Sequence, residues 1–203
     1  MKTQLTNINQ LHQFIEQFNF ATIVNHDNDG LNVSHVPVIL DSHEGPQGTL
    51  KWHLAKQNVQ AQKIADNKEI LCIFQGPHAY ISPRWYKNQP SVPTWNYAVV
   101  HVYGNPEQVS DQELENDLSQ LVKLYEGEAY IIPDDYRLKL MHHIVGFKMQ
   151  ITKIKGIFKL GQNRSQQDQE GMLDGLRNQN TASLALAEFI NIWRNADNKG
   201  DVS

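Results

Sequence analysis

Polar side chains gather at four places along this chain, each beside a stretch typical of a β-strand. They are His35, "HLAKQN" at residues 53–58, "PTWNY" at 93–97 and "KLGQNR" at 159–164. Lysine, arginine and amide groups donate hydrogen bonds to anionic oxygens, and aromatic rings pack against flat ring systems. If the strands of one barrel bring these stretches together, they form one concave polar binding site.

Familiar catalytic motifs are missing from the sequence. It contains no nucleophile elbow, no phosphate loop, no G-x-G-x-x-G and no H-E-x-x-H, and we assign no catalytic residue. Three histidines, His35, His53 and His101, fall on expected strands, and neutral imidazole binds metals. We expect these histidines to hydrogen-bond a ligand or the backbone, and we predict no metal site.

Composition limits the class of protein. The 203 residues fit one large domain, or a domain with an appendage. The net charge is −4 and the basic residues are scattered, so direct nucleic-acid binding is doubtful. A single cysteine, Cys72, excludes an internal disulfide. We find no membrane-length apolar run and no secretory signal, and expect a cytoplasmic protein without membrane contact.

Hydrophobic periodicity predicts a mainly β protein with flanking helices. Helices are expected over residues 7–18, after the Ser110–Glu113 capping box, from about Ser165, and over 181–195. Asp29-Gly30 predicts a hairpin turn, and "EILCIFQG" at 69–76 is typical of a central strand. Because strands neighbour one another without regular βαβ alternation, we predict a mostly antiparallel barrel.

The strand at residues 95–103 has two largely apolar faces. Alternation places Trp95, Tyr97, Val99, His101 and Tyr103 on one face, and Asn96, Ala98, Val100 and Val102 on the other. In a barrel one face looks inward. We expect the other to be covered by a helix or by a second subunit.

Four segments resemble one known family. "FQGPHAYISPRWY", "VPTWNYAVVHVYG", "HLAKQN" and "KLGQNR" are similar to motifs of the PaiB-type FMN-binding negative transcriptional regulators. The resemblance runs in order from about residue 14 to about 176, and the block at 74–104 is its most specific part. It implies a split β-barrel of the pyridoxamine-phosphate-oxidase type. It also implies a homodimer that binds flavin mononucleotide (FMN) at the dimer interface.

The resemblance directs attention to a set of flavin-binding residues. Lys56, Asn58 and Arg164 are donors suited to the phosphate. Backbone groups of 35–37 and 53–55 would line the isoalloxazine ring, amides would bond its polar edge, and aromatic side chains would pack on it. The expected cofactor-binding residues are His35, Val36, Pro37, His53, Leu54, Ala55, Lys56, Asn58, Trp95, Asn96, Tyr97, Lys159, Gln162, Asn163 and Arg164.

The sequence predicts three parts along the chain. We expect a split-barrel domain with flanking helices at 1–160, a helical extension packed on it at 161–196, and a disordered tail at 197–203.

The sequence departs from the family at one site position, because Gly161 stands where the family usually has a serine. The protein would act through bound flavin. The alternatives are a flavin-dependent oxidoreductase acting on a small molecule, a haem-binding protein, and a cofactor-free binding protein.

Overall fold

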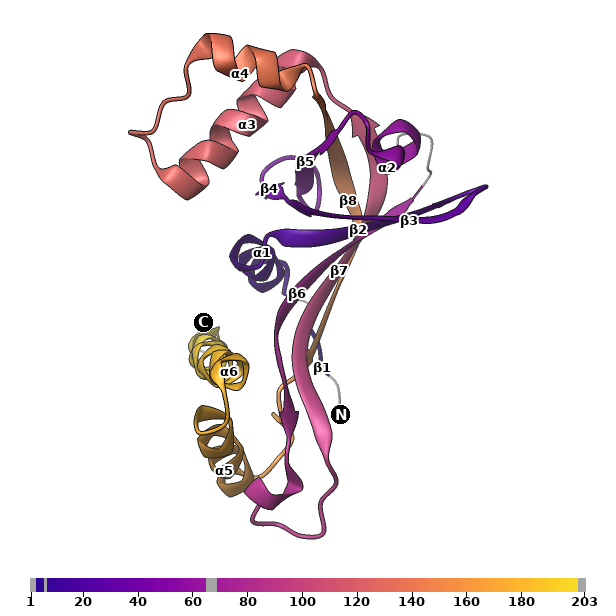
Figure 1. Ribbon diagram of the computed structural model, residues 1–203. Coiled ribbons are helices and arrows are strands. Elements are labelled where there is room, and N and C mark those ends of the chain that lie inside the picture. Colours follow the sequence, from indigo (N-terminus) through magenta and orange to yellow (C-terminus); the bar gives the residue numbers. More distant parts are fainter. Residues whose placement is uncertain (1–2, 6, 65–68, 201–203) are drawn as a thin grey trace. The chain divides into compact units, whose positions relative to one another are not determined.

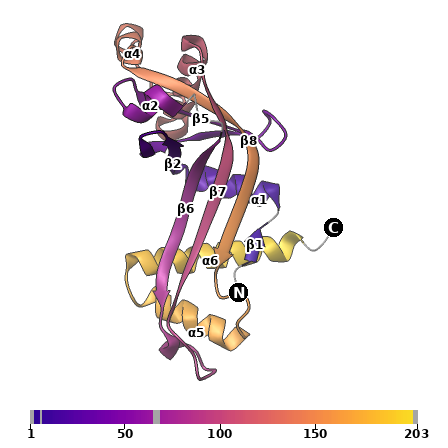
Figure 2. The same ribbon diagram turned by 90° about the vertical axis from the view of Figure 1, so that its right-hand side faces the viewer.

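A computed structural model describes residues 3–5, 7–64 and 69–200 of the chain. Its centre is an eight-stranded sheet in the order β3-β2-β6-β7-β8-β5-β4, with β1 paired to β8. The long strands β6 (Ile70–Ile81), β7 (Thr94–Gln108) and β8 (Ile144–Lys159) lie side by side (Figures 1 and 2). The pairings with known register are all antiparallel, as the sequence predicts.

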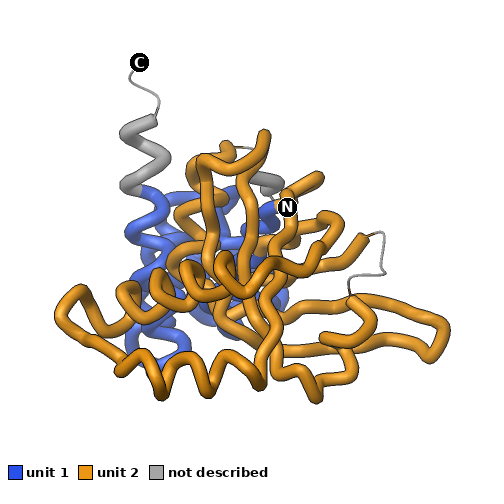
Figure 3. Tube along the Cα trace, turned by 90° about the horizontal axis from the view of Figure 1, so that it is seen from above, with its two compact units in different colours: residues 1–5, 75–99, 156–203 blue, residues 6–74, 100–155 orange. Residues whose placement is uncertain are grey.

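The chain divides into two compact units (Figure 3). Unit 1 contains residues 1–5, 75–99 and 156–203, and unit 2 contains residues 6–74 and 100–155. Strands β6, β7 and β8 therefore contribute residues to both units.

Unit 2 contains four of the shorter strands. Strands β2 (Phe20–Asp27) and β3 (Gly30–Pro37) form a hairpin, and Asp27 pairs with Gly30 at its turn. Strand β4 (Ile39–Asp41) pairs with β5 (Thr49–Ala55), which pairs in turn with residues 144–150 of β8. The core lies between these strands, where the Trp52 and Phe147 rings stack with centroids 5.9 Å apart. Cys72 is fully buried there, and burial raises the pKa of its thiol to about 12.

Side chains cap three helices of unit 2, two of them at starts that the sequence predicts and the third at Asn58, which the sequence analysis did not assign as a cap. Asn7 accepts backbone hydrogen bonds at the start of α1 (Ile8–Gln17), and Asn58 does so for α2 (Val59–Lys63). Ser110 and Glu113 form the predicted capping box of α3 (Asp111–Glu126). Helix α4 (Asp134–Met141) follows, and α3 and α4 form a hairpin (Figure 1).

In unit 1, helices pack against the parts of the long strands that belong to this unit. Strand β1 (Thr3–Leu5) pairs with β8, and the short 3-10 helix η2 (Pro83–Trp85) follows β6. Ser165 caps α5 (Gln166–Arg177), which confirms the expected helix start. Helix α6 (Thr181–Gly200) places Phe189 and Trp193 against Phe158 of β8, with the Trp193 and Phe158 ring centroids 4.7 Å apart.

The alternation predicted for β7 is confirmed on one face. Asn96, Ala98, Val100 and Val102 are all buried. The opposite face is only half-covered by this chain, and its first residue, Trp95, is 55% exposed. A second subunit as the cover of this face stays a prediction.

Helix α5 approaches η2 so closely that two of its positions must be glycine. A Cβ atom on Gly171 would lie 2.2 Å from the Trp85 carbonyl oxygen, and one on Gly175 would lie 2.2 Å from Cδ2 of the Trp85 ring. Both distances are shorter than any van der Waals contact. The glycines thus let the indole ring lie directly on the backbone of α5.

We expect Gly175→Ala to destabilise the protein by about 1–3 kcal/mol, because the added methyl overpacks the contact with Trp85. Without that contact, alanine would stabilise the helix by about 1 kcal/mol. Chemical denaturation of Gly175→Ala, Trp85→Ala and the double variant measures both effects. In the Trp85→Ala background the same substitution should become stabilising. A destabilisation that persists there would rule out the ring as the cause.

The C-terminal boundaries agree only in part with expectation. Helix α6 extends to Gly200, beyond the expected end at residue 195, so residues 197–200 of the expected disordered tail are helical. Residues 201–203 of that tail lie outside the described residues. The division into a barrel at 1–160 and an extension at 161–196 stays a prediction. None of the described helices is both long and apolar enough to span a membrane.

Candidate functional site

Unit 1 contains a polar cleft at the end of β8. Its volume is about 280 Å³. Residues from β7, from the loop after η2 and from the turn that follows β8 line it. The lining residues are Tyr86, Val92, Thr94, Asn96, Lys159, Gly161, Asn163 and Arg164. Four of the predicted flavin-binding residues, Asn96, Lys159, Asn163 and Arg164, therefore meet in one cleft.

Arg164 is held in the cleft by its neighbours. Its guanidinium carbon lies 4.3 Å from the centroid of the Tyr86 ring, a cation–π contact. Its Nη1 donates to the Ser91 hydroxyl at 3.4 Å, and its backbone N–H donates to the Gly161 carbonyl at 3.0 Å. The contact with Tyr86 orients the planar guanidinium, which has further N–H groups to offer a ligand.

Lys159 supplies the second cation. Its Nζ donates to the Thr94 hydroxyl. Within the described residues, neither Lys159 nor Arg164 forms an ion pair with a carboxylate. Two cations that share a cleft and lack carboxylate partners attract an anion, and a phosphate suits both donors.

A buried carboxylate supports the loop above Arg164. Asp168 of α5 is 2% exposed and accepts from the backbone N–H groups of Lys87 and Asn88, at 2.8 and 3.0 Å. The Asn88 side chain donates to its other oxygen at 3.0 Å. These bonds, the Asn88 backbone N–H foremost, lower the pKa of Asp168 although burial opposes them. Asp168 thus ties residues 86–91 to α5.

The other predicted residues of unit 1 have different surroundings. Asn96 is buried, with its amide nitrogen 3.2 Å from the Met172 sulfur. The Gln162 side chain accepts from the Leu160 N–H and donates to the Phe158 carbonyl, so it closes the turn after β8. Trp95 packs on His78 and Tyr80 at the exposed face of β7, and Tyr97 is half-buried on the same face.

The backbone conformation explains why residue 161 is a glycine, although the family usually has a serine there. Gly161 has φ of +75°, a left-handed conformation that glycine adopts without strain. A Cβ atom there would also lie 3.0 Å from the Met172 sulfur. This turn places Asn163 and Arg164 beside the cleft, so glycine at this position serves the geometry of the site.

The predicted residues of unit 2 lie at the ends of β3 and β5. His35 is exposed and its Nδ1 shares a hydrogen bond with Thr22, while Val36 and Pro37 complete β3. On β5, Leu54 is buried in the core, His53 is half-buried and Ala55 is exposed. Lys56 is exposed, and its backbone N–H donates to the His143 carbonyl.

Asn58 has a structural task that the sequence analysis did not assign. Its Oδ1 caps α2, and its amide nitrogen donates to the Ser34 hydroxyl at 2.9 Å. Its side chain is therefore already engaged on two sides. One N–H of its amide is left for a ligand.

Sequence reasoning missed three residues that shape the cleft. Tyr86, Ser91 and Asp168 were not predicted as site residues, although they orient or support Arg164. A proline-rich loop gives no periodic signal, and Asp168 three residues after Ser165 indicates only a helix start. Among the described residues, no group of three or more His, Cys, Asp or Glu side chains is placed to hold a metal.

The cleft passes one test for a flavin nucleotide. Its lysine, arginine and asparagine donors match the chemistry of a phosphate, and its volume lies just below the usual range of small-molecule sites. The antiparallel sheet and the donors of this cleft are compatible with a protein that binds a flavin nucleotide.

The particular family follows from comparison. A model of the family described as "Putative FMN-binding domain" matches residues 2–153, and the chain belongs to this family. FMN is accordingly its cofactor. The chain is 30% identical over 194 residues to "Protease synthase and sporulation protein PAI 2" of Bacillus subtilis (strain 168), covering 92% of this chain and 93% of the relative. The PaiB-type resemblance is thus confirmed.

Solved structures support the fold. The structure of the FAD and heme binding protein from Mycobacterium smegmatis aligns with a TM-score of 0.61 at 11% identity, covering 77% of this chain and 73% of that one. The flavocytochrome Anf3 from Azotobacter vinelandii aligns with a TM-score of 0.61 at 10% identity, covering 77% and 69%. The split-barrel prediction is confirmed.

Proposed function

We propose that the protein is a homodimer that binds FMN at the subunit interface and acts as a regulator through the flavin. In this proposal Lys159 and Arg164 of one copy hold the phosphate. The ends of β3 and β5, with His35–Pro37 and His53–Asn58, face the isoalloxazine ring from the partner. Trp95, Asn96, Tyr97, Gln162 and Asn163 complete the binding site or support it.

One observation supports this proposal above the others. Lys159 and Arg164 meet in a polar cleft, and neither has a carboxylate partner among the described residues. Most cations near a folded surface are either fully hydrated or paired. Two that are pre-oriented by Thr94 and Tyr86 are typical of a site for a phosphate group.

The exposed face of β7 supports the dimer. Trp95 is 55% exposed and Tyr80, which it contacts, is 38% exposed. Aromatic groups gathered on a strand face are enriched at subunit interfaces. A second copy would remove them from water and bring its own strand ends to the cleft.

The regulatory role rests on the flavin rather than on direct DNA contact. The net charge of −4 disfavours electrostatic binding to the phosphate backbone of DNA. The Bacillus subtilis relative PAI 2 is named for protease synthesis and sporulation. We propose that this protein acts in the cytoplasm, where its one thiol stays reduced.

An absorbance spectrum of the purified protein tests the flavin assignment, followed by heat release and identification of the chromophore. We expect a flavin spectrum, FMN in the supernatant and one FMN per chain after reconstitution. Light scattering should give twice the chain mass of 23.3 kDa. A colourless protein that takes up no added FMN would contradict the flavin site. A monomeric flavoprotein would contradict only the interface.

A further inference from the structure

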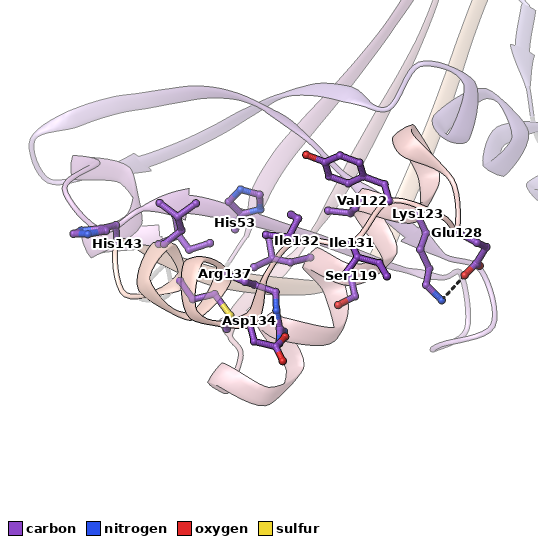
Figure 4. Close-up of a pocket in the computed structure, with 15 residues that line it drawn as sticks. His53, Ser119, Val122, Lys123, Glu128, Ile131, Ile132, Asp134, Arg137 and His143 are labelled. Carbon is purple, nitrogen blue, oxygen red and sulfur yellow. Dashed lines mark hydrogen bonds and ion pairs between the residues drawn. The ribbon is translucent and has the colours of Figure 1, made fainter.

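A second and larger cavity lies in unit 2, between α3, α4 and the segment that joins them. Its volume is about 620 Å³, within the range of small-molecule sites. Figure 4 shows its lining, which includes Val122, Ile131 and Ile132. Leu118, Leu140 and Ile144 add further aliphatic surface. A cavity of this size with an aliphatic lining favours an apolar occupant over water.

The charged groups at the cavity neutralise one another. Lys123 Nζ lies 3.0 Å from a carboxylate oxygen of Glu128, and Arg137 Nη2 lies 2.8 Å from one of Asp134. Arg137 also pairs with Glu115 of α3. The lining thus offers no unpaired cation or anion, so a charged ligand gains no free counter-ion there.

Among the uncharged polar side chains in the wall, His53 is the half-buried one, whereas Ser119, Tyr130 and His143 are exposed. The half-buried His53 ring faces the cavity from β5 (Figure 4). Within the described part of the chain, no hydrogen-bond partner occupies its ring nitrogens. Burial lowers the pKa of His53, so its imidazole is neutral at pH 7 and offers one donor and one acceptor.

From this lining we infer that the α3–α4 cavity is a binding site for an uncharged, largely apolar small molecule that exchanges a hydrogen bond with His53. The aliphatic walls stabilise the body of the ligand, and the imidazole fixes its orientation. The site is distinct from the Lys159–Arg164 cleft of unit 1 in both lining and charge. It gives a flavin-binding regulator a place to take up an apolar effector.

FMN itself does not suit this cavity. Its phosphate requires cations, and both cations of the lining are already paired with carboxylates. The flavin proposed above meets the same end of β5, so the inference rests on the proposed function in one respect: the His53 imidazole must face the cavity and not the flavin ring. The inference is decided by whether neutral apolar molecules bind in the α3–α4 cavity.

The test uses FMN-loaded protein and two probes of one skeleton. N-phenyl-1-naphthylamine is uncharged, and 8-anilino-1-naphthalenesulfonate carries an added sulfonate. Equilibrium dialysis measures both, since flavin absorption does not affect it. We expect saturable binding of the neutral probe at one per chain. The sulfonate should bind at least about tenfold more weakly because its charge finds no partner. Equal or tighter binding of the sulfonate would overturn the inference.

Two tryptophan substitutions on α3 locate the binding site. Val122→Trp fills the cavity and should weaken the neutral probe at least about tenfold. Leu124→Trp, two residues along the helix and 59% exposed, lies outside the lining and should leave affinity within about twofold. Unchanged binding to Val122→Trp would overturn the inference, as would displacement of the probe by excess FMN. If the neutral probe does not bind the intact dimer, the inference is also overturned, and the partner subunit would be the occupant of the cavity.

Discussion

Replacing Arg164 by alanine should weaken FMN binding by roughly 10- to 100-fold. A hydrogen bond to a charged group contributes about 1.5–3 kcal/mol, and Arg164 presents its guanidinium to the cleft already oriented on Tyr86. Lysine at this position keeps the charge but loses the planar fork, so Arg164→Lys should recover only part of the affinity. Fluorescence titration of flavin into the apoprotein measures the dissociation constants.

Riboflavin provides the decisive control for Arg164. It has the same ring and ribityl chain as FMN but no phosphate, so its affinity should be nearly the same in wild type and Arg164→Ala. Arg177→Ala is the matched protein control, because Arg177 lies on α5 of the same unit and pairs with Asp174 at 3.0 Å. An equal loss of affinity for both flavins would show that Arg164 supports the fold rather than the phosphate.

Replacing Asp168 by alanine should lower the melting temperature by roughly 5–10 °C. The substitution leaves the backbone N–H groups of Lys87 and Asn88 without their acceptor, a carboxylate that is itself 2% exposed. Residues 86–91 would then lose their attachment to α5, and FMN affinity should fall with them. Asp174→Ala, on the exposed side of the same helix, should change the melting temperature by no more than about 2 °C.

The pH dependence gives Asp168 a second readout. Because its folded pKa is depressed, the carboxylate stabilises the folded state fully above its unfolded pKa of about 3.9. That contribution is lost as the pH falls through the folded pKa. The melting temperatures of wild type and Asp168→Ala should therefore differ at pH 7 and converge in strong acid. A difference that persists unchanged at low pH would contradict the role of the carboxylate.

The sequence determined the class of fold and much of its local detail. Alternating apolar residues predicted the strands, and Asn7, Ser110 and Ser165 marked the helix starts where the structure has them. These signals are local, because a cap or an alternation depends on residues within a few positions of one another. The motifs around residues 74–104 also indicated the family, since a long specific segment identifies its relatives directly.

Only the tertiary structure decided which polar residues form a site. Arg164 meets Tyr86 and Ser91 across more than seventy residues of sequence, and Asp168 reaches Lys87 in the same way. Asn58, which the sequence presented as a phosphate donor, caps a helix, and Gln162 closes a turn. The α3–α4 cavity was not predicted at all. The partner of a side chain depends on which distant segment of the chain folds next to it. Short-range sequence patterns do not specify such long-range contacts.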